Sequence, residues 1–255
     1  MKEPKPFTLS PEYQELVQIT QARVSINHEQ INLPNHDPVS EKTYNRIFNE
    51  LIKPNDIIIN VGAGYAVDFT KQVNHLNGQL QNVCGEKNAK LIAVDINISN
   101  LSTHQDLKYI TNQQHLEVVQ ADALELPFAD NSVAGITSSN LINCPNSSIS
   151  LEEQAEKFIS EAYRVLVSGG FLIITSFGYK YAYDDNDVKY HNDLLEDGQI
   201  LTLKQTQTIL EKIGFKKISE LEVENEDGGI VENKLRNFNV LLPTEEAGGF
   251  IAYKI

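Results

Sequence analysis

Between residues 51 and 255, short apolar runs alternate with longer segments in which apolar positions recur at helical spacing. The runs are rich in Ile, Val and Leu, which is typical of strands buried on both faces of a parallel sheet. In the segment 151–166, by contrast, Phe158, Ala162 and Val165 fall on one side of a predicted helix. The pattern predicts strands at 56–61, 90–95, 115–120, 133–139, 171–176, 215–223 and 249–255, and helices at 65–76, 100–112, 151–166 and 202–213.

The order of these elements indicates the fold class. Strict alternation of strands and helices implies a parallel sheet with helices on both faces. The last two predicted strands are joined without a convincing helix, which is what an antiparallel final strand requires. We therefore expect an α/β fold in which residues 51–255 form a seven-stranded, mostly parallel sheet with an antiparallel last strand. Residues 1–50 are more polar, and their scattered apolar positions predict a separate N-terminal helical segment that covers the active site.

A glycine turn follows the first predicted strand, in the segment Val61-Gly62-Ala63-Gly64-Tyr65-Ala66. Gly62 permits a sharp turn out of the strand, and Gly64 lets a ligand approach the backbone closely. The start of the next helix would direct free N–H groups at an anion. Such a turn alone is compatible with nucleotides, dinucleotides, S-adenosylmethionine or no ligand at all.

Two acidic residues narrow this choice. Asp95 ends the second predicted strand, where a carboxylate accepts hydrogen bonds from the ribose hydroxyls of an adenosine. Asp122 follows the third strand and would face the same crevice, where its carboxylate would accept from an adenine amino group. Either residue is also compatible with a simple cap of a helix or loop. Two acids after consecutive strands favour an adenosine ligand over two unrelated caps.

Four segments then occur in a characteristic order: INVGAGYA, LIAVDIN, VVQADALELPFADNSVAGITSSNLIN and FISEAYRVLVSGGFLIITSF. Over about residues 50–180 this order resembles the class I S-adenosylmethionine-dependent methyltransferases, especially the branch that includes the ubiquinone/menaquinone-biosynthesis methyltransferases. The resemblance implies a Rossmann-like methyltransferase fold and S-adenosyl-L-methionine as cofactor. It also implies cofactor contacts from Gly62, Ala63 and Gly64 at the methionine end, Asp95 at the ribose, Ile96, Asp122 and Ala123 at the adenine, and Asn140 near the sulfonium. Tyr44, before the first strand, would close over the cofactor.

The chain departs from this family at two positions of the turn. Asn60 stands where the family usually carries an acid, and Ala66 stands where it usually carries a third glycine. These departures keep open a methyltransferase-like protein without catalysis, which would act as a cofactor-binding or protein-interaction module. A nicotinamide-dependent oxidoreductase is a third reading. Val67 argues against this interpretation, because it stands where the dinucleotide pattern G-x-G-x-x-G requires its last small residue.

Methyl transfer is an in-line displacement that requires alignment and exclusion of water, and a base only when the acceptor must lose a proton. We therefore assign no catalytic residue, and name His191 and Tyr179, in the region after the fifth strand, as candidates.

Composition decides the class of acceptor and the setting of the protein. The net charge of −14 argues against nucleic acid, and no apolar stretch has the length of a membrane span. Cys84 and Cys144 do not form a metal-type pair, so no metal site is expected. We expect a cytoplasmic protein with a small-molecule acceptor, and a protein substrate stays open as an alternative.

Overall fold

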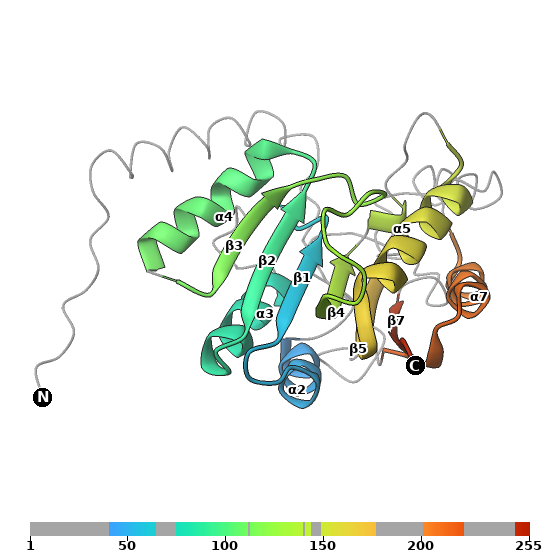
Figure 1. The fold of residues 1–255 in the computed structure, drawn as a ribbon, viewed down its shortest axis with the longest axis horizontal. Helices are drawn as coiled ribbons and strands as arrows, with labels where there is room; N and C mark the ends of the chain where they lie inside the picture. Colours follow the sequence, from blue (N-terminus) through green and yellow to red (C-terminus); the bar gives the residue numbers. More distant parts are fainter. Residues whose placement is uncertain are drawn as a thin grey trace, which may run out of the picture.

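The computed structural model describes residues 41–64, 75–111, 113–139, 141–143, 149–176, 201–221 and 248–255. Their centre is a seven-stranded sheet with the order β3-β2-β1-β4-β5-β7-β6 (Figure 1). Neighbouring strands from β3 to β5 are parallel, whereas β7 runs antiparallel to β5 and to β6. The predicted α/β fold with an antiparallel last strand is therefore confirmed. The strands are β1 (Ile57–Val61), β2 (Lys90–Asp95), β3 (Leu116–Gln120), β4 (Val133–Ser139), β5 (Leu166–Ser176), β6 (Lys216–Glu220) and β7 (Gly248–Tyr253).

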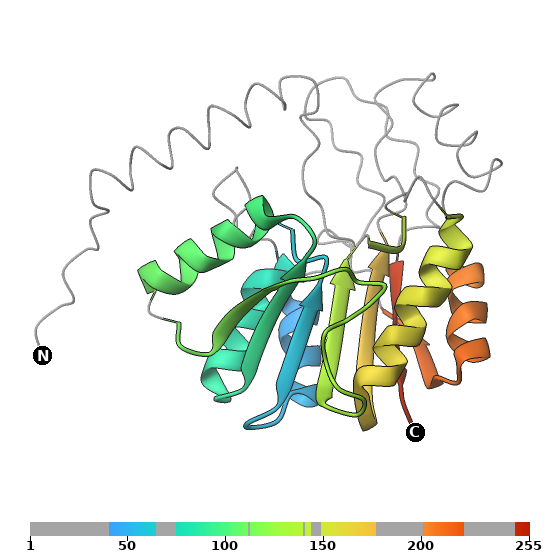
Figure 2. The same cartoon turned by 45° about the horizontal axis from the view of Figure 1, so that its top comes forward.

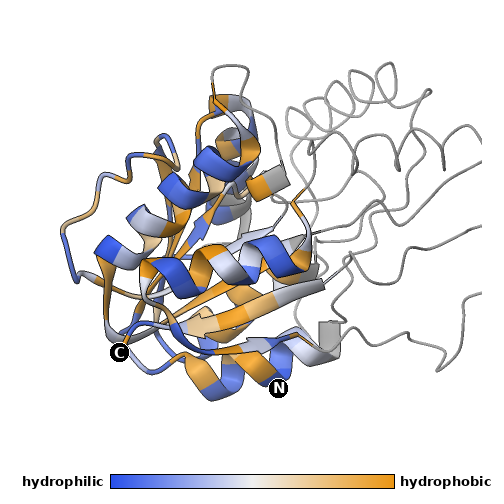
Figure 3. Ribbon diagram, turned by 90° about the vertical axis from the view of Figure 1, so that its right-hand side faces the viewer, coloured by the Kyte–Doolittle hydropathy of each residue, from blue (hydrophilic) through white to orange (hydrophobic). Residues whose placement is uncertain are grey.

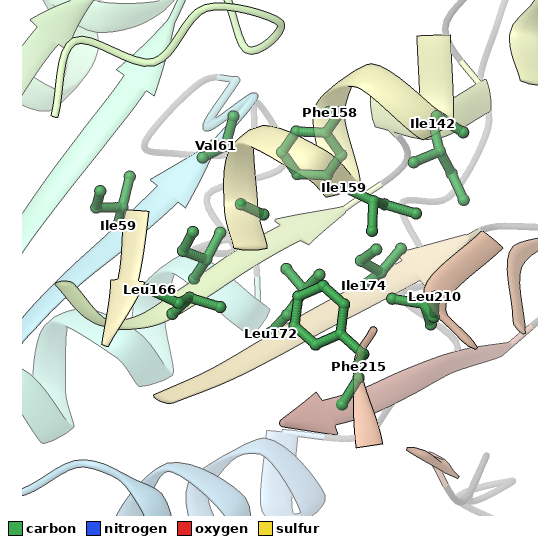
Figure 4. Close-up of a cluster of buried hydrophobic side chains, with 14 of the residues drawn as sticks. Ile59, Val61, Ile142, Phe158, Ile159, Leu166, Leu172, Ile174, Leu210 and Phe215 are labelled. Atoms are coloured by element: carbon green, nitrogen blue, oxygen red, sulfur yellow. The ribbon is translucent and has the colours of Figure 1, made fainter. Parts of the chain in front are cut away.

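Helices cover both faces of the sheet. On one face, α5 and α7 pack on a core cluster that includes Val61, Phe158, Ile174, Leu210 and Phe215 (Figure 4). On the other face, α2, α3 and α4 enclose a second cluster. The described helices are α2 (Glu41–Leu51), α3 (His75–Glu86), α4 (Ile98–Thr111), α5 (Leu151–Val165) and α7 (Leu203–Ile213), with a short 3₁₀ turn, η1 (Leu141–Asn143). None of the helices in these ranges is long and apolar enough to cross a membrane.

The helix α5 shows why these segments fold as they do. The hydroxyl of Ser150 caps its first turn by accepting a hydrogen bond from the backbone N–H of Glu153. Its buried residues recur at helical spacing and its charged residues lie on the opposite side, so hydrophilic and hydrophobic bands alternate along the helices in Figure 3. Burial of one stripe therefore fixes α5 against the sheet.

One boundary differs from the sequence prediction. The sequence predicts a gap at 167–170, which includes Gly169 and Gly170, between a helix at 151–166 and a strand at 171–176, but β5 already begins at Leu166. Leu166 pairs with Val133 and Phe171 pairs with Gly135, so residues 167–170 bulge out of the ladder. Gly169 adopts a φ of +84°, which only glycine tolerates easily. The glycines thus bend the strand without ending it.

Two other predictions lie partly outside the described residues. Of the helix expected at 65–76, only the last two residues are described, and they begin α3. Of the segment expected at 1–50, only α2 is described, so the predicted division into two parts stays a prediction.

Candidate functional site

A cavity of about 430 Å³ lies at the carboxyl ends of β1, β2, β3 and β4. The arrowheads of these parallel strands point to one common edge in Figure 2. The strand order reverses between β1 and β4, and open α/β sheets bind their ligands at such a reversal. The volume of the cavity lies in the range of small-molecule sites. The cavity is lined by Val61, Gly62, Gly64, Val94, Asp95, Ile96, Asn97, Asn100, Ala121, Asp122, Ala123, Leu124, Ser139, Leu141, Ile142, Gln154 and Phe158.

The glycine turn forms one wall of this cavity. Gly62 and Gly64 adopt φ angles of +67° and +59°. The backbone N–H of Ala63 donates to the carbonyl of Val94 at 3.0 Å and joins the turn to β2. A Cβ on Gly62 would lie 3.2 Å from the side chain of Leu141, whereas a Cβ on Gly64 would meet no described atom within 4 Å. Among the described residues, nothing therefore prevents a ligand from contacting the backbone at Gly64.

Asp95 connects the glycine turn to the beginning of α4. Its carboxylate is 8% exposed; Oδ2 accepts from the backbone N–H of Gly64 at 2.9 Å, and Oδ1 accepts from that of Asn97 at 2.8 Å. A carboxylate has about four acceptor positions, so two stay available for a ligand. Asp95 is thus both a structural bridge and an acceptor that fits two ribose hydroxyls.

The opposite wall comes from the segment after β3. Asp122 is exposed, and its Oδ1 accepts from the backbone N–H of Leu124 at 2.9 Å, as a loop cap does. Ile96 is 67% exposed although its side chain is large and apolar. Ile96, Asp122 and Ala123 all line the cavity. An exposed apolar surface beside a carboxylate matches a flat heterocycle with an amino group.

The loop that carries Asp122 is held in place from α5. The Arg164 guanidinium donates to the carbonyls of Leu126 and Phe128 at 2.9 and 2.8 Å. It also donates to Glu161, which accepts from the backbone N–H of Leu126 at 2.8 Å. This hydrogen bond from Arg164 lowers the pKa of Glu161. Arg164, in the RVL segment, and Glu161 therefore hold the LPFAD segment against α5.

Asn60, where the chain departs from the resembled family, is 3% exposed and does not line the cavity. Its Oδ1 accepts from the Thr137 hydroxyl at 3.1 Å across β1 and β4. The neutral amide therefore makes a bond within the sheet.

The other predicted site residues either do not line the cavity or lie outside the described residues. Ala63 is 5% exposed and Tyr44 is fully buried, and neither lines the cavity as far as the described residues define it. The Tyr44 ring stacks on that of Phe48, with 5.5 Å between centroids. The contacts of Tyr44 and Ala63 with a cofactor stay predictions. Three candidates, Asn140, His191 and Tyr179, lie outside the described residues, as does Ala66.

Several residues of the site escaped the sequence prediction because they come from helices. Gln154 and Phe158 reach the cavity from α5, and Asn100 reaches it from α4. His104, also on α4, is 2% exposed, and its Nε2 lies 3.2 Å from the carbonyl oxygen of Gly64. One feature of the sequence could have indicated that His104 is buried: it follows Leu101 by three residues and so lies on the same helical face, and Leu101 is buried.

Residues 74–174 match the family model described as a methyltransferase domain. A comparison with curated proteins finds no match. Haemonchus contortus phosphoethanolamine N-methyltransferase 2, solved with S-adenosyl-L-methionine, aligns with a TM-score of 0.58 and 17% identity, over 98% of this chain and 61% of that chain. An Aquifex aeolicus S-adenosylmethionine-dependent methyltransferase aligns with a TM-score of 0.55 and 15% identity, over 89% and 95%. A Thermotoga maritima S-adenosylmethionine-dependent O-methyltransferase aligns with a TM-score of 0.51 and 13% identity, over 91% and 70%.

At these identities the solved structures show a common fold, and the chain spans only about three fifths of the length of the Haemonchus protein. The family model matches the part of the chain from α3 to β5, which carries two of the cavity walls. Residues 74–174 therefore match the methyltransferase-domain family model, and the strand order with its antiparallel β7 is that of the Rossmann-like methyltransferase fold.

Proposed function

We propose that this protein transfers the methyl group of S-adenosyl-L-methionine to a small-molecule acceptor. The observation that carries the proposal is the cavity in which Gly64, Asp95 and Asp122 meet at the reversal of strand order. Within the described residues it combines a glycine whose Cβ position is unobstructed, a buried carboxylate with acceptor positions left over, and an exposed apolar side chain that lines the same cavity as a second carboxylate. These features match an amino-acid tail, a ribose and an adenine in that order.

The residues would then take the following roles. Asp95 would accept from the ribose hydroxyls, and Ile96 would pack on the adenine ring. Asp122 and Ala123 would contact the adenine edge. The glycine turn would contact the methionine part. Two further cofactor contacts stay in the proposal: Asn140, from the resemblance, and Tyr44, from its position on the helix before the first strand.

The cofactor supplies a methyl group on a positively charged sulfur. The chain's own residues bind and orient the reactants and exclude water. Leu141, Ile142 and Phe158 form an apolar wall suited to this exclusion. His191 remains the proposed candidate for a base, which is needed only if the acceptor must lose a proton, and Tyr179 remains a candidate for packing on the acceptor or facing the sulfonium.

Two hydroxyls support an acceptor site next to the cofactor site. Ser139 lines the cavity at the end of β4, and Thr175 is its register partner on β5. Both Oγ atoms are buried and lack a hydrogen-bond partner among the described residues. Buried hydroxyls normally have partners, so a polar group of the acceptor fits here. The Haemonchus relative is named for phosphoethanolamine, which is also a small polar molecule. The finer resemblance, to the ubiquinone/menaquinone branch, is part of this proposal, as is the expected cytoplasmic location.

A methyltransferase-like binding module is the second candidate, and Asn60 favours it. An amide stands two positions before the first glycine of the turn, where the resembled family usually carries an acid. This amide is buried and accepts a hydrogen bond from Thr137.

The test incubates the full chain with S-adenosylmethionine and a panel of small amines, alcohols and phenols, and measures S-adenosylhomocysteine by mass spectrometry. Acceptor-dependent formation of this product is the expected result. Calorimetric titration with S-adenosylhomocysteine accompanies it. Binding without turnover on any acceptor favours the binding module, and no binding of either ligand refutes the proposed cofactor site.

A further inference from the structure

His104 contacts the glycine turn and is not among the residues that line the cavity. It is 2% exposed on α4, and its Nε2 lies 3.2 Å from the carbonyl oxygen of Gly64. Because a carbonyl oxygen can only accept, Nε2 must carry the proton, which leaves Nδ1 as an acceptor. Nδ1 is buried and has no partner within the described part of the chain.

The burial of this imidazole favours its neutral form. Burial lowers the pKa of His104, while the carbonyls of Gly64 and Ala63 and the carboxylate of Asp95 act in the opposite direction. Protonation would place a second N–H at Nδ1, where no acceptor is present among the described residues. One tautomer, with its proton on Nε2, is therefore maintained.

Gly64 is consequently held from both sides. Its N–H donates to Asp95 Oδ2 at 2.9 Å, and its carbonyl accepts from His104. These two bonds fix the peptide groups on either side of its Cα, and hence both φ and ψ. Glycine has more conformational freedom to lose than any other residue, so an unrestrained Gly64 would have to be ordered by the ligand. A turn ordered in advance spares the ligand this cost.

We propose that His104 is a positioning residue for the cofactor: its Nε2–H fixes the carbonyl of Gly64 and thereby keeps the turn in its ligand-binding conformation. This inference rests on the proposed function, because it assigns the turn to S-adenosylmethionine. It goes beyond that function by placing part of the affinity in a side chain that does not line the cavity.

The test compares variants of the full chain by calorimetric titration with S-adenosylhomocysteine and by thermal unfolding. His104→Met has a similar length but no donor, and the net value of one hydrogen bond predicts about tenfold weaker binding. His104→Gln carries an amide nitrogen the same number of bonds from the backbone as Nε2, so it should restore binding to within about threefold of wild type. If the Met variant does not fold, His104→Asn, whose amide is one bond too short, should show the same loss.

His115 provides a matched control. Its Nε2 also contacts a backbone carbonyl, but this is the carbonyl of Gln81 in α3, at 3.1 Å, and not one of the glycine turn. His115→Met should lower the melting temperature and leave the affinity unchanged.

Three outcomes would overturn the inference while wild type binds: unchanged affinity in His104→Met or in its substitute His104→Asn, failure of His104→Gln to restore binding, or an equal loss in His115→Met. If wild type itself does not bind S-adenosylhomocysteine, the proposed function fails instead.

Discussion

The substitution Gly64→Ala separates a ligand site from a simple tight turn. Gly64 has a φ of +59°, so any other residue there takes the left-handed conformation, which costs about 1–2 kcal/mol. The new Cβ would meet no described atom within 4 Å and would project into the cavity that we assign to the cofactor. We therefore expect two separate effects, a modest loss of stability and a larger loss of affinity for S-adenosylhomocysteine.

Gly169→Ala is the matched control for the strain. Gly169 has a φ of +84°, and a Cβ there would also meet no described atom within 4 Å. It lies in the bulge of β5, at the opposite end of the sheet from the cavity. Both variants should lose about 1–2 kcal/mol in urea denaturation.

Only Gly64→Ala should weaken binding, by about tenfold or more, which corresponds to at least ~1.4 kcal/mol. Wild-type affinity in Gly64→Ala, or an equal loss in both variants, would refute the assignment of this wall to the cofactor.

Asp122→Asn keeps an oxygen for the N–H of Leu124 but removes the charge, so we expect an unchanged melting temperature and a several-fold weaker titration with S-adenosylhomocysteine, about 1 kcal/mol; unchanged affinity would show that Asp122 is only a loop cap. Arg164→Met frees two carbonyls of the loop at 126–128 and should cost about 2 kcal/mol in urea denaturation. The pKa of Glu161 is lowered in the folded state, so its stabilisation is complete above its unfolded pKa of about 4.3 and is lost as pH falls through the folded value. Melting temperatures measured from pH 6 to 3 should show this loss. In Glu161→Gln, the fall in melting temperature with pH should be smaller by the part that Glu161 contributes.

Hydrophobic runs were sufficient to predict most of the sheet. The bounds of β2 and β4 agree with the prediction because buried parallel strands are almost wholly apolar and end in polar residues. The start of β5 was wrong because a pair of glycines is compatible with both a break and a bulge. The pairing of Leu166 with Val133 decides between them, and this contact between distant segments leaves no local mark in the sequence.

The site residues divide in the same way, into those that a local pattern predicts and those that depend on contacts between distant segments. Asp95 and Asp122 were predicted to line one cavity, and they do, because the carboxyl ends of parallel strands meet at one edge. His104, Gln154 and Phe158 were not predicted, since a buried position on a helix does not reveal what the helix packs against. Tyr44 was expected to close over the cofactor from its position before the first strand; the structure places its ring in the core beside Phe48, and that contact stays a prediction.

The central claim is that the cavity at the carboxyl ends of β1, β2, β3 and β4 binds the adenosine part of S-adenosylmethionine. A crystal structure of the full chain grown with S-adenosylhomocysteine tests it most directly. The account predicts ribose hydroxyls on the carboxylate of Asp95, adenine between Ile96 and Asp122, and the amino-acid part next to Gly64. A ligand bound elsewhere, or this cavity left empty at saturating ligand, would contradict it.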